Sequence, residues 1–221
     1  IDGYLGIINN SKLTHLDAFS SISSLNDLGI TNNKSLKSTS GLSSLTAVNR
    51  FLTVQQNDSL TSIEFPLLKS IGIDLNISNN DLLQNISNLD SLTQVGRNLS
   101  IYDNPSLTEI HAFQNLDPLL GSLIIDNNAQ LEIIDGFSNL NHIGQDFNVT
   151  NNLALSTCCS FYHIMDQEVI TNGQAVVGSI NLFNNSMGCN SMAEIIANQN
   201  CPIYGCTDPF AHNHNVEATV D

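Results

Sequence analysis

The sequence contains no tryptophan and only three methionines, and lysine and arginine together account for six of its 221 residues. Asp and Glu number 21, so the formal net charge is −15. So few cations cannot neutralise a run of phosphates, which excludes nucleic acid as a partner and disfavours docking on an anionic membrane. No apolar run reaches the roughly 18 residues that a membrane-spanning helix needs, so we expect no membrane span.

Motifs of catalysis are also missing. The sequence has neither a Gly-rich phosphate loop nor a zinc-enzyme motif, and nothing in it places a partner beside His15, His111 or His142. Serines are common, but they occupy repeated turn positions, whereas a serine nucleophile needs a paired base and an oxyanion site. We therefore predict that the chain is not an enzyme, with no catalytic residue and no required cofactor.

What the sequence does contain is a repeat. The phrase Leu-x-Ile-x-Asn-Asn-x-x-Leu begins at Leu5 and returns with small changes six times, before a shorter last copy at Ile180. Alternation of apolar residues places them on one face of a strand, and one coil alone cannot bury that face. The fold class predicted is a β-solenoid: a right-handed coil with a parallel sheet and about eight coils of 23–24 residues.

The second asparagine of each phrase is predicted to be structural. It follows the strand, and amides stacked in register can hydrogen-bond to one another and satisfy buried polar groups. The predicted ladder consists of Asn10, Asn33, Asn57, Asn80, Asn104, Asn128, Asn152 and Asn185. The return half of each coil, for example Leu89-x-x-Leu92-x-x-Val95-Gly96, favours a 3₁₀-like path, in which the glycine allows a sharp re-entry into the next strand.

The x positions of each strand should point outward, away from the core. In the middle coils they form a polar, largely uncharged strip in which Tyr102 could stack against a ligand. The candidate ligand-binding residues are Thr53, Gln55, Asn76, Ser78, Ser100, Tyr102 and Asp126. The alternative interpretation is an ordinary solvated sheet face.

Beyond residue 157 the pattern changes. Cys158-Cys159 and Gly178-Ser179-Ile180 precede the segment Gly188-Cys189-Asn190-Ser191-Met192, and Cys201 follows. With the repeats, these residues resemble the receptor L-domain type of leucine-rich solenoid known from growth-factor receptor ectodomains, and more closely the repeat proteins secreted by Bacteroidetes bacteria. The resemblance implies a secreted or cell-surface protein with a repeat solenoid at 1–157, a disulfide-bonded cap at 158–204 and a truncated cysteine-containing tail at 205–221.

Five cysteines in an exported chain indicate two disulfides and one unpaired cysteine. The spacing favours Cys158–Cys189 with Cys159–Cys201, because Cys158 occupies an inward position and Cys189 lies about one coil further on; the exchanged pairing stays open. A Cys₄ zinc site is disfavoured because no C-x₂-C pair is present. The segment 191–198 predicts a short amphipathic helix that covers the open end of the core.

In the tail, Asp208, Asn213 and Asn215 carry the oxygen ligands that Ca²⁺ takes, although their order is not that of an EF-hand. A tail without bound calcium is the alternative. For the whole chain we expect an extracellular binding or adhesion module with a protein or glycan partner. A carbohydrate-binding module and a passive structural stalk are the alternatives, and no oligomeric state follows from the pattern.

Overall fold

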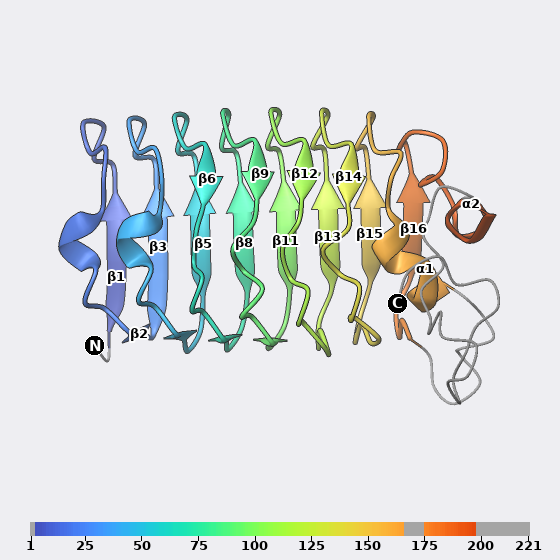
Figure 1. Ribbon diagram of the computed structural model, residues 1–221, viewed down its shortest axis with the longest axis horizontal. Helices are drawn as coiled ribbons and strands as arrows, with labels where there is room; N and C mark the ends of the chain where they lie inside the picture. The colour runs from blue at the N-terminus through green and yellow to red at the C-terminus, as the bar shows by residue number, and fades with distance from the viewer. Residues whose placement is uncertain (1–2, 166–174, 198–221) are drawn as a thin grey trace, which may run out of the picture.

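The computed structural model describes residues 3–165 and 175–197, which form a β-solenoid with all its strand pairs parallel (Figure 1). Its main sheet has eight strands, side by side from the blue N-terminal end to the red C-terminal end (Figure 1). In spatial order they are β1 (Tyr4–Ile8), β3 (Asp27–Thr31), β5 (Leu52–Gln55), β8 (Leu75–Ser78), β11 (Leu99–Tyr102), β13 (Leu123–Asp126), β15 (Phe147–Thr150) and β16 (Ile180–Phe183). The predicted solenoid is confirmed.

Two smaller parallel sheets form the return side of the coils. One contains β2 (Ser24–Leu25), β4 (Ala47–Val48), β7 (Ser70–Ile71) and β10 (Gln94–Val95). The other contains β6 (Ser62–Ile63), β9 (Asn85–Ile86), β12 (Glu109–Ile110) and β14 (Ile133–Ile134). Regular turns of 23 or 24 residues lead from Leu5 through paired positions to Phe147, and a step of 33 residues then leads to Ile180.

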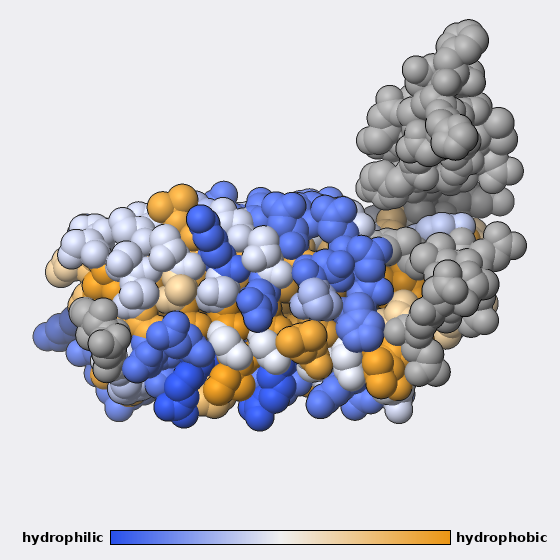
Figure 2. Space-filling model, turned by 90° about the horizontal axis from the view of Figure 1, so that it is seen from below, coloured by the Kyte–Doolittle hydropathy of each residue, from blue (hydrophilic) through white to orange (hydrophobic). Residues whose placement is uncertain are grey.

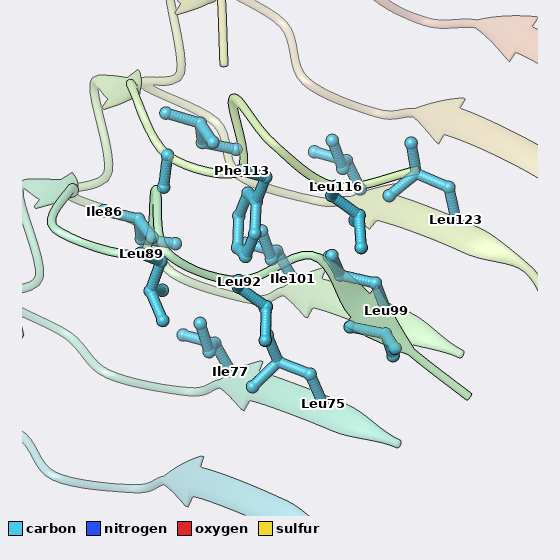
Figure 3. Packing of buried hydrophobic residues seen from close by; sticks show 14 of the residues in the cluster. Leu75, Ile77, Ile86, Leu89, Leu92, Leu99, Ile101, Phe113, Leu116 and Leu123 are labelled. Carbon is cyan, nitrogen blue, oxygen red and sulfur yellow. The ribbon is translucent and has the colours of Figure 1, made fainter. Parts of the chain in front are cut away.

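The core lies between the main sheet and the return segments. In the middle coils, Leu75 and Ile77 of β8 face Leu89 and Leu92 of the return segment (Figure 3). All four side chains are fully buried, and the neighbouring coils repeat the arrangement. Each coil therefore depends on its neighbours for burial of apolar surface, as expected for a repeat array.

The 3₁₀-like return path that the sequence predicted is confirmed in part. Within the described repeats, 3₁₀ helices occur only in the first two coils, as η1 (Asp17–Phe19) and η2 (Ser40–Leu42), and each is followed by a short strand. The later coils keep a single i→i+3 bond, for example from the Leu92 N–H to the Leu89 carbonyl at 3.0 Å. Backbone groups of adjacent coils lie in register and pair, for example the Gly96 N–H with the Ile71 carbonyl at 2.9 Å. The return path thus combines local 3₁₀-type bonds with backbone bonds between coils, and together they satisfy its polar groups.

The return glycines have a different reason from the one predicted. Gly96 has no positive φ, but a Cβ built on it would lie 2.0 Å from the Gly72 carbonyl oxygen. A Cβ built on Gly72 would likewise lie 1.9 Å from the Asn49 carbonyl oxygen. These residues are glycines because the backbone of the preceding coil occupies the space of a side chain.

The two residues of the Asn-Asn pair that follows each strand have different structural roles. The first residue takes a left-handed conformation, as at Asn79 (φ 55°), which Asn tolerates better than most residues. The second is fully buried in the six coils from Asn33 to Asn152. From Asn57 onward, its Oδ1 accepts both the backbone N–H and the side-chain Nδ2–H of the preceding asparagine, as Asn104 does for Asn80 at 3.1 and 3.2 Å. The side-chain amides thus form a continuous ladder along the solenoid.

The C-terminal end of the array is closed by η3 (Cys159–Phe161), α1 (Tyr162–Met165) and α2 (Met192–Ala197). Phe161 continues the internal stack of Phe113 and Phe137, with ring centroids 5.1 and 5.4 Å apart. Ile195 of α2 is buried, and the predicted Cys158–Cys189 disulfide is confirmed, with a Cα–Cα distance of 6.0 Å. Among residues 3–165 and 175–197, no helix is long and apolar enough to cross a membrane.

Candidate functional site

The main sheet has an outward face made of three columns of side chains, one residue per strand in each. The start column is Tyr4, Asp27, Phe51, Asp74, Asn98, Ser122, Asp146 and Ser179. The middle column is Gly6, Gly29, Thr53, Asn76, Ser100, Ile124, Asn148 and Asn181. The end column is Ile8, Thr31, Gln55, Ser78, Tyr102, Asp126, Thr150 and Phe183. All seven candidate ligand-binding residues lie in the middle and end columns.

The centre of this face is less open than the sequence suggested. The Tyr102 hydroxyl accepts a hydrogen bond from Asn76 Nδ2 on the preceding strand, at 3.3 Å. Its ring therefore leans towards that strand, and the neighbouring Ser78 is fully buried although it belongs to the outward face. Ser78 is therefore inaccessible to solvent in this conformation, because a long neighbouring side chain covers a short one, and its contact with a ligand stays a prediction.

Two polar atoms in this central region lack partners. Ser78 Oγ and Asn76 Oδ1 are both inaccessible to solvent and make no hydrogen bond. The oxygen and nitrogen of an amide point apart, so Asn76 Oδ1 faces away from Tyr102. Buried polar groups without partners are uncommon and costly, and each calls for an explanation.

Further along the face, the Asp126 side chain is hydrogen-bonded to residues of the next coil. Its Oδ1 accepts hydrogen bonds from the Thr150 hydroxyl at 2.5 Å and from Asn151 Nδ2 at 2.8 Å. Ser100 lies beside Asn76 in the middle column and is half-buried. The structure therefore brings Ser100, Tyr102 and Asp126 to one surface, with the Asp126 carboxylate already holding the next strand.

The start column forms a second, more exposed ladder that the sequence reasoning missed. Asp74 Oδ1 accepts the Asn98 backbone N–H at 3.0 Å, and Asn98 Oδ1 accepts that of Ser122 at 2.9 Å. Asp146 Oδ1 continues the pattern with Ser179, at 2.8 Å. Seen from the side where the main-sheet strands begin, the surface is largely hydrophilic, with apolar residues between (Figure 2). These side-chain oxygens of the start column therefore stabilise the stacking of the coils by accepting backbone N–H groups of the next coil.

At the N-terminal end the same face holds a groove of about 380 Å³. Its floor is formed by the middle column at Gly29 and Thr53, and its walls by the flanking columns. The walls are Tyr4, Asp27 and Phe51 on one side and Ile8, Thr31 and Gln55 on the other. Two of the sequence candidates, Thr53 and Gln55, thus line a groove whose other residues were not predicted.

Tyr4 lies flat on the glycines of the middle column. A Cβ on Gly6 would be 2.6 Å from Tyr4 Cε1, and a Cβ on Gly29 would be 2.8 Å from the Tyr4 hydroxyl and 3.4 Å from Cε2. The two edges of the ring therefore rest on two different strands. Because Tyr4 remains 61% exposed, its outer surface is open to solvent. Tyr4 was not predicted because alternation alone does not show that glycines on neighbouring strands make room for a ring.

The charged groups beside the groove are paired. Arg50 Nη1 lies 3.6 Å from Asp27 Oδ2, and the Arg50 guanidinium lies over the Phe51 ring at 5.2 Å from its centroid. Asp27 Oδ1 also accepts the Phe51 backbone N–H at 3.3 Å. The groove is therefore bordered by a neutralised ion pair, and its lining combines apolar side chains such as Ile8 and Phe51 with the uncharged polar groups of Thr31, Thr53 and Gln55.

His111 has two partners, so the expectation that its loop offers none is wrong. Its Nδ1 lies 2.6 Å from Asp135 Oδ1, and its Nε2 lies 2.8 Å from Glu109 Oε2. Burial lowers the pKa of His111, but the hydrogen bonds to Asp135 and Glu109 and their charges outweigh it and raise the pKa. The signal was in the sequence, because Asp135 stands one 24-residue repeat after His111.

This cluster predicts a pH-dependent contribution to stability. Because the folded-state pKa is raised, the stabilisation is fully present below the unfolded-state pKa and is lost as pH rises through the folded-state pKa. All three side chains are partly exposed, so we expect less than about 1 kcal/mol. Urea titrations of wild type and His111→Gln should differ at about pH 5.5 and converge by about pH 8.5. An equal difference at both pH values would contradict the ion-pair interpretation.

Several predicted sites lie outside the described residues. They are Cys201, the predicted partner of Cys159, and the calcium candidates Asp208, Asn213 and Asn215. Within the described part of the chain, no group of three or more His, Cys, Asp or Glu side chains is placed to hold a metal ion. No protein-family model, curated protein or solved structure matches this chain.

Proposed function

We propose that this chain is a non-enzymatic binding module of a secreted or cell-surface protein and that it binds an extracellular protein or glycan through the outward face of its main sheet. The groove across β1, β3 and β5 is the observation that carries this proposal. There Gly29 stands in place of a larger side chain, and the hydroxyl and amide groups of Thr31, Thr53 and Gln55 line the opening. Concave sites with a few convergent polar groups are the usual form of binding sites.

Two further observations favour an extracellular location. The Cys158–Cys189 disulfide is of a kind that persists in oxidising compartments and is rare in the cytosol. The repeat also resembles the L-domain solenoids of growth-factor receptor ectodomains. On this resemblance, the proposal includes that the chain is a leucine-rich-repeat protein. Adhesion would then follow if the module is part of a larger surface protein.

Beads coated with the oxidised protein provide the test, against an immobilised panel of extracellular-matrix proteins and glycans. Gln55→Trp should fill the end-column side of the groove and weaken the strongest interaction at least tenfold, about 1.4 kcal/mol. Gln94→Trp, an exposed residue of β10 on the return side, is the matched control and should bind as wild type does.

The passive stalk is the competing interpretation, and the same experiment separates the two. A stalk predicts no interaction above background for wild type or either variant. Equal loss of binding in Gln55→Trp and Gln94→Trp would instead show that a bulky residue disturbs the coil at either position. Undiminished binding in both variants would show that the binding surface lies outside the groove.

A further inference from the structure

We propose that the groove binds an uncharged oligosaccharide whose sugar units lie along the solenoid axis, from the Tyr4 ring to the Asn76 amide. This inference rests on the proposed function and narrows its partner to one chemical class. Three features carry it: an exposed aromatic surface, polar atoms without partners, and the charge of the surroundings.

The Tyr4 ring provides the aromatic surface. It lies against Gly6 and Gly29, so one face is held by the sheet while the other is open to solvent. Phe51 stands two strands away in the same column, on the same wall of the groove. The faces of aromatic rings carry partial negative charge, which suits the polarised C–H groups on the apolar side of a sugar ring.

The unpartnered atoms lie on β8, the strand next to the groove's last strand β5, and are covered in this conformation. Thr53 and Gln55 pair in register with Asn76 and Ser78, whose Oδ1 and Oγ make no hydrogen bond. Either orientation of the Asn76 amide leaves one of its two polar atoms unsatisfied, because only one of them faces Tyr102. Ser78 is fully buried, so its hydroxyl gains a partner only from a group that enters beside it.

Tyr102 controls access to these atoms. The bond from Asn76 Nδ2 to its hydroxyl, at 3.3 Å, is longer than most hydrogen bonds between nitrogen and oxygen. A ligand hydroxyl can replace it at little cost, and displacement of the Tyr102 ring also opens Ser78 Oγ, which lies in register with Tyr102, to a second ligand hydroxyl. Sugar hydroxyls suit this role because each one both donates and accepts.

The dimensions fit more than one sugar unit. Gly29, under the Tyr4 hydroxyl, lies two strands from Asn76, which at the spacing of a β-sheet is about 10 Å. A single sugar ring cannot span that distance, whereas two linked units can. The ligand is therefore at least a disaccharide.

The charges favour a neutral ligand over an anionic one. The chain carries a net charge of −15, and Arg50, the cation beside the groove, is already paired with Asp27. A carboxylated or sulfated glycan would meet repulsion without a free cation to offset it. An extended peptide is disfavoured too, since the backbone groups of β3 and β5 pair with neighbouring strands and offer it no edge.

The test uses isothermal titration calorimetry with cello-, xylo-, manno- and malto-oligosaccharides of one to six units, and with oligogalacturonate as the acidic series. We expect at least one neutral series to bind, with an affinity at least tenfold higher for the disaccharide than for the monosaccharide. Oligogalacturonate should not bind. Absence of binding by every neutral series, or preference for oligogalacturonate, would overturn the proposal.

Two variants separate the proposed contacts from effects on the fold. Tyr4→Ala should weaken binding at least tenfold. Ser78→Ala removes a hydroxyl that makes no hydrogen bond, so it should leave the melting temperature unchanged or raised while weakening the ligand at least threefold. The control Asn148→Ala lies in the middle column on β15, away from the groove, and should bind as wild type does. Undiminished affinity in both Tyr4→Ala and Ser78→Ala would exclude this groove as the sugar site.

The bead assay distinguishes failure of this inference from failure of the proposed function. If a matrix protein binds through a Gln55-dependent surface while no neutral sugar does, the binding module stands and the glycan is wrong. If neither a protein nor a sugar binds, both proposals fail and the stalk remains.

Discussion

Asn104→Ala should lower the free energy of unfolding by about 3 kcal/mol. The substitution removes the oxygen that accepts the Asn80 backbone N–H at 3.1 Å, and it leaves that N–H buried without a partner. It also removes the donor to the carbonyl oxygens of Ile77 and Tyr102, at 3.1 and 3.0 Å. A urea titration followed by circular dichroism measures the loss.

Asn49→Ala is the matched control for the ladder. The Asn49 amide also bonds to the neighbouring coil, donating to Asn26 Oδ1 at 2.8 Å, but Asn49 is exposed and Asn26 is only partly buried. Water replaces the lost bond, so the cost should stay within about 0.5 kcal/mol. Similar losses in Asn49→Ala and Asn104→Ala would show that burial of the amide is not what makes the ladder important.

The second large effect is expected for Gly96→Ala. The added methyl group would lie 2.0 Å from the carbonyl oxygen of Gly72, where no real contact can exist, so the two coils must move apart. That movement strains the bond from the Gly96 N–H to the Ile71 carbonyl and loosens the packing beneath it. We expect a loss of about 3 kcal/mol or more, measured in the same titration.

Gly29→Ala adds the same methyl group on the main sheet and serves as the control for Gly96→Ala. The nearest atom to the new methyl group is the Tyr4 hydroxyl, at 2.8 Å, which is the free end of a side chain and can rotate away. The stability should change by less than about 1 kcal/mol. If Gly29→Ala destabilises as much as Gly96→Ala, close approach of the backbone is not the reason for the return glycines.

The sequence was most informative where a physical rule leaves few choices. Alternation at positions such as Leu99 and Ile101 assigns side chains to the core or to the outward face without reference to anything else. The steps of 23 and 24 residues then bring equivalent residues side by side. The Cys158–Cys189 bond follows from the same reasoning, because the 33-residue step still places Cys189 one coil beyond Cys158.

The sequence was least informative where side chains of different strands share space. No local pattern shows that Tyr102 leans over Ser78, or that Tyr4 rests on Gly29, since these depend on rotamers and on the size of the neighbouring residues. The triplet spacing of the return segments likewise suits both a 3₁₀ turn and a bent extended chain. The structure combines a local i→i+3 bond at the turn with pairing to the adjacent coil, and the second contact is not local.

The buried amides also bear on how the chain avoids folding incorrectly. Eight strands of nearly the same sequence are interchangeable partners, and their alternation excludes only those misalignments that shift a strand by an odd number of residues. A slip by two would keep Leu and Ile inward, yet it would move Asn80 away from the Asn104 oxygen and bury its amide among groups that cannot bond it. The buried asparagines therefore fix the register of the strands, because they destabilise the misalignments that hydrophobic patterning alone would allow.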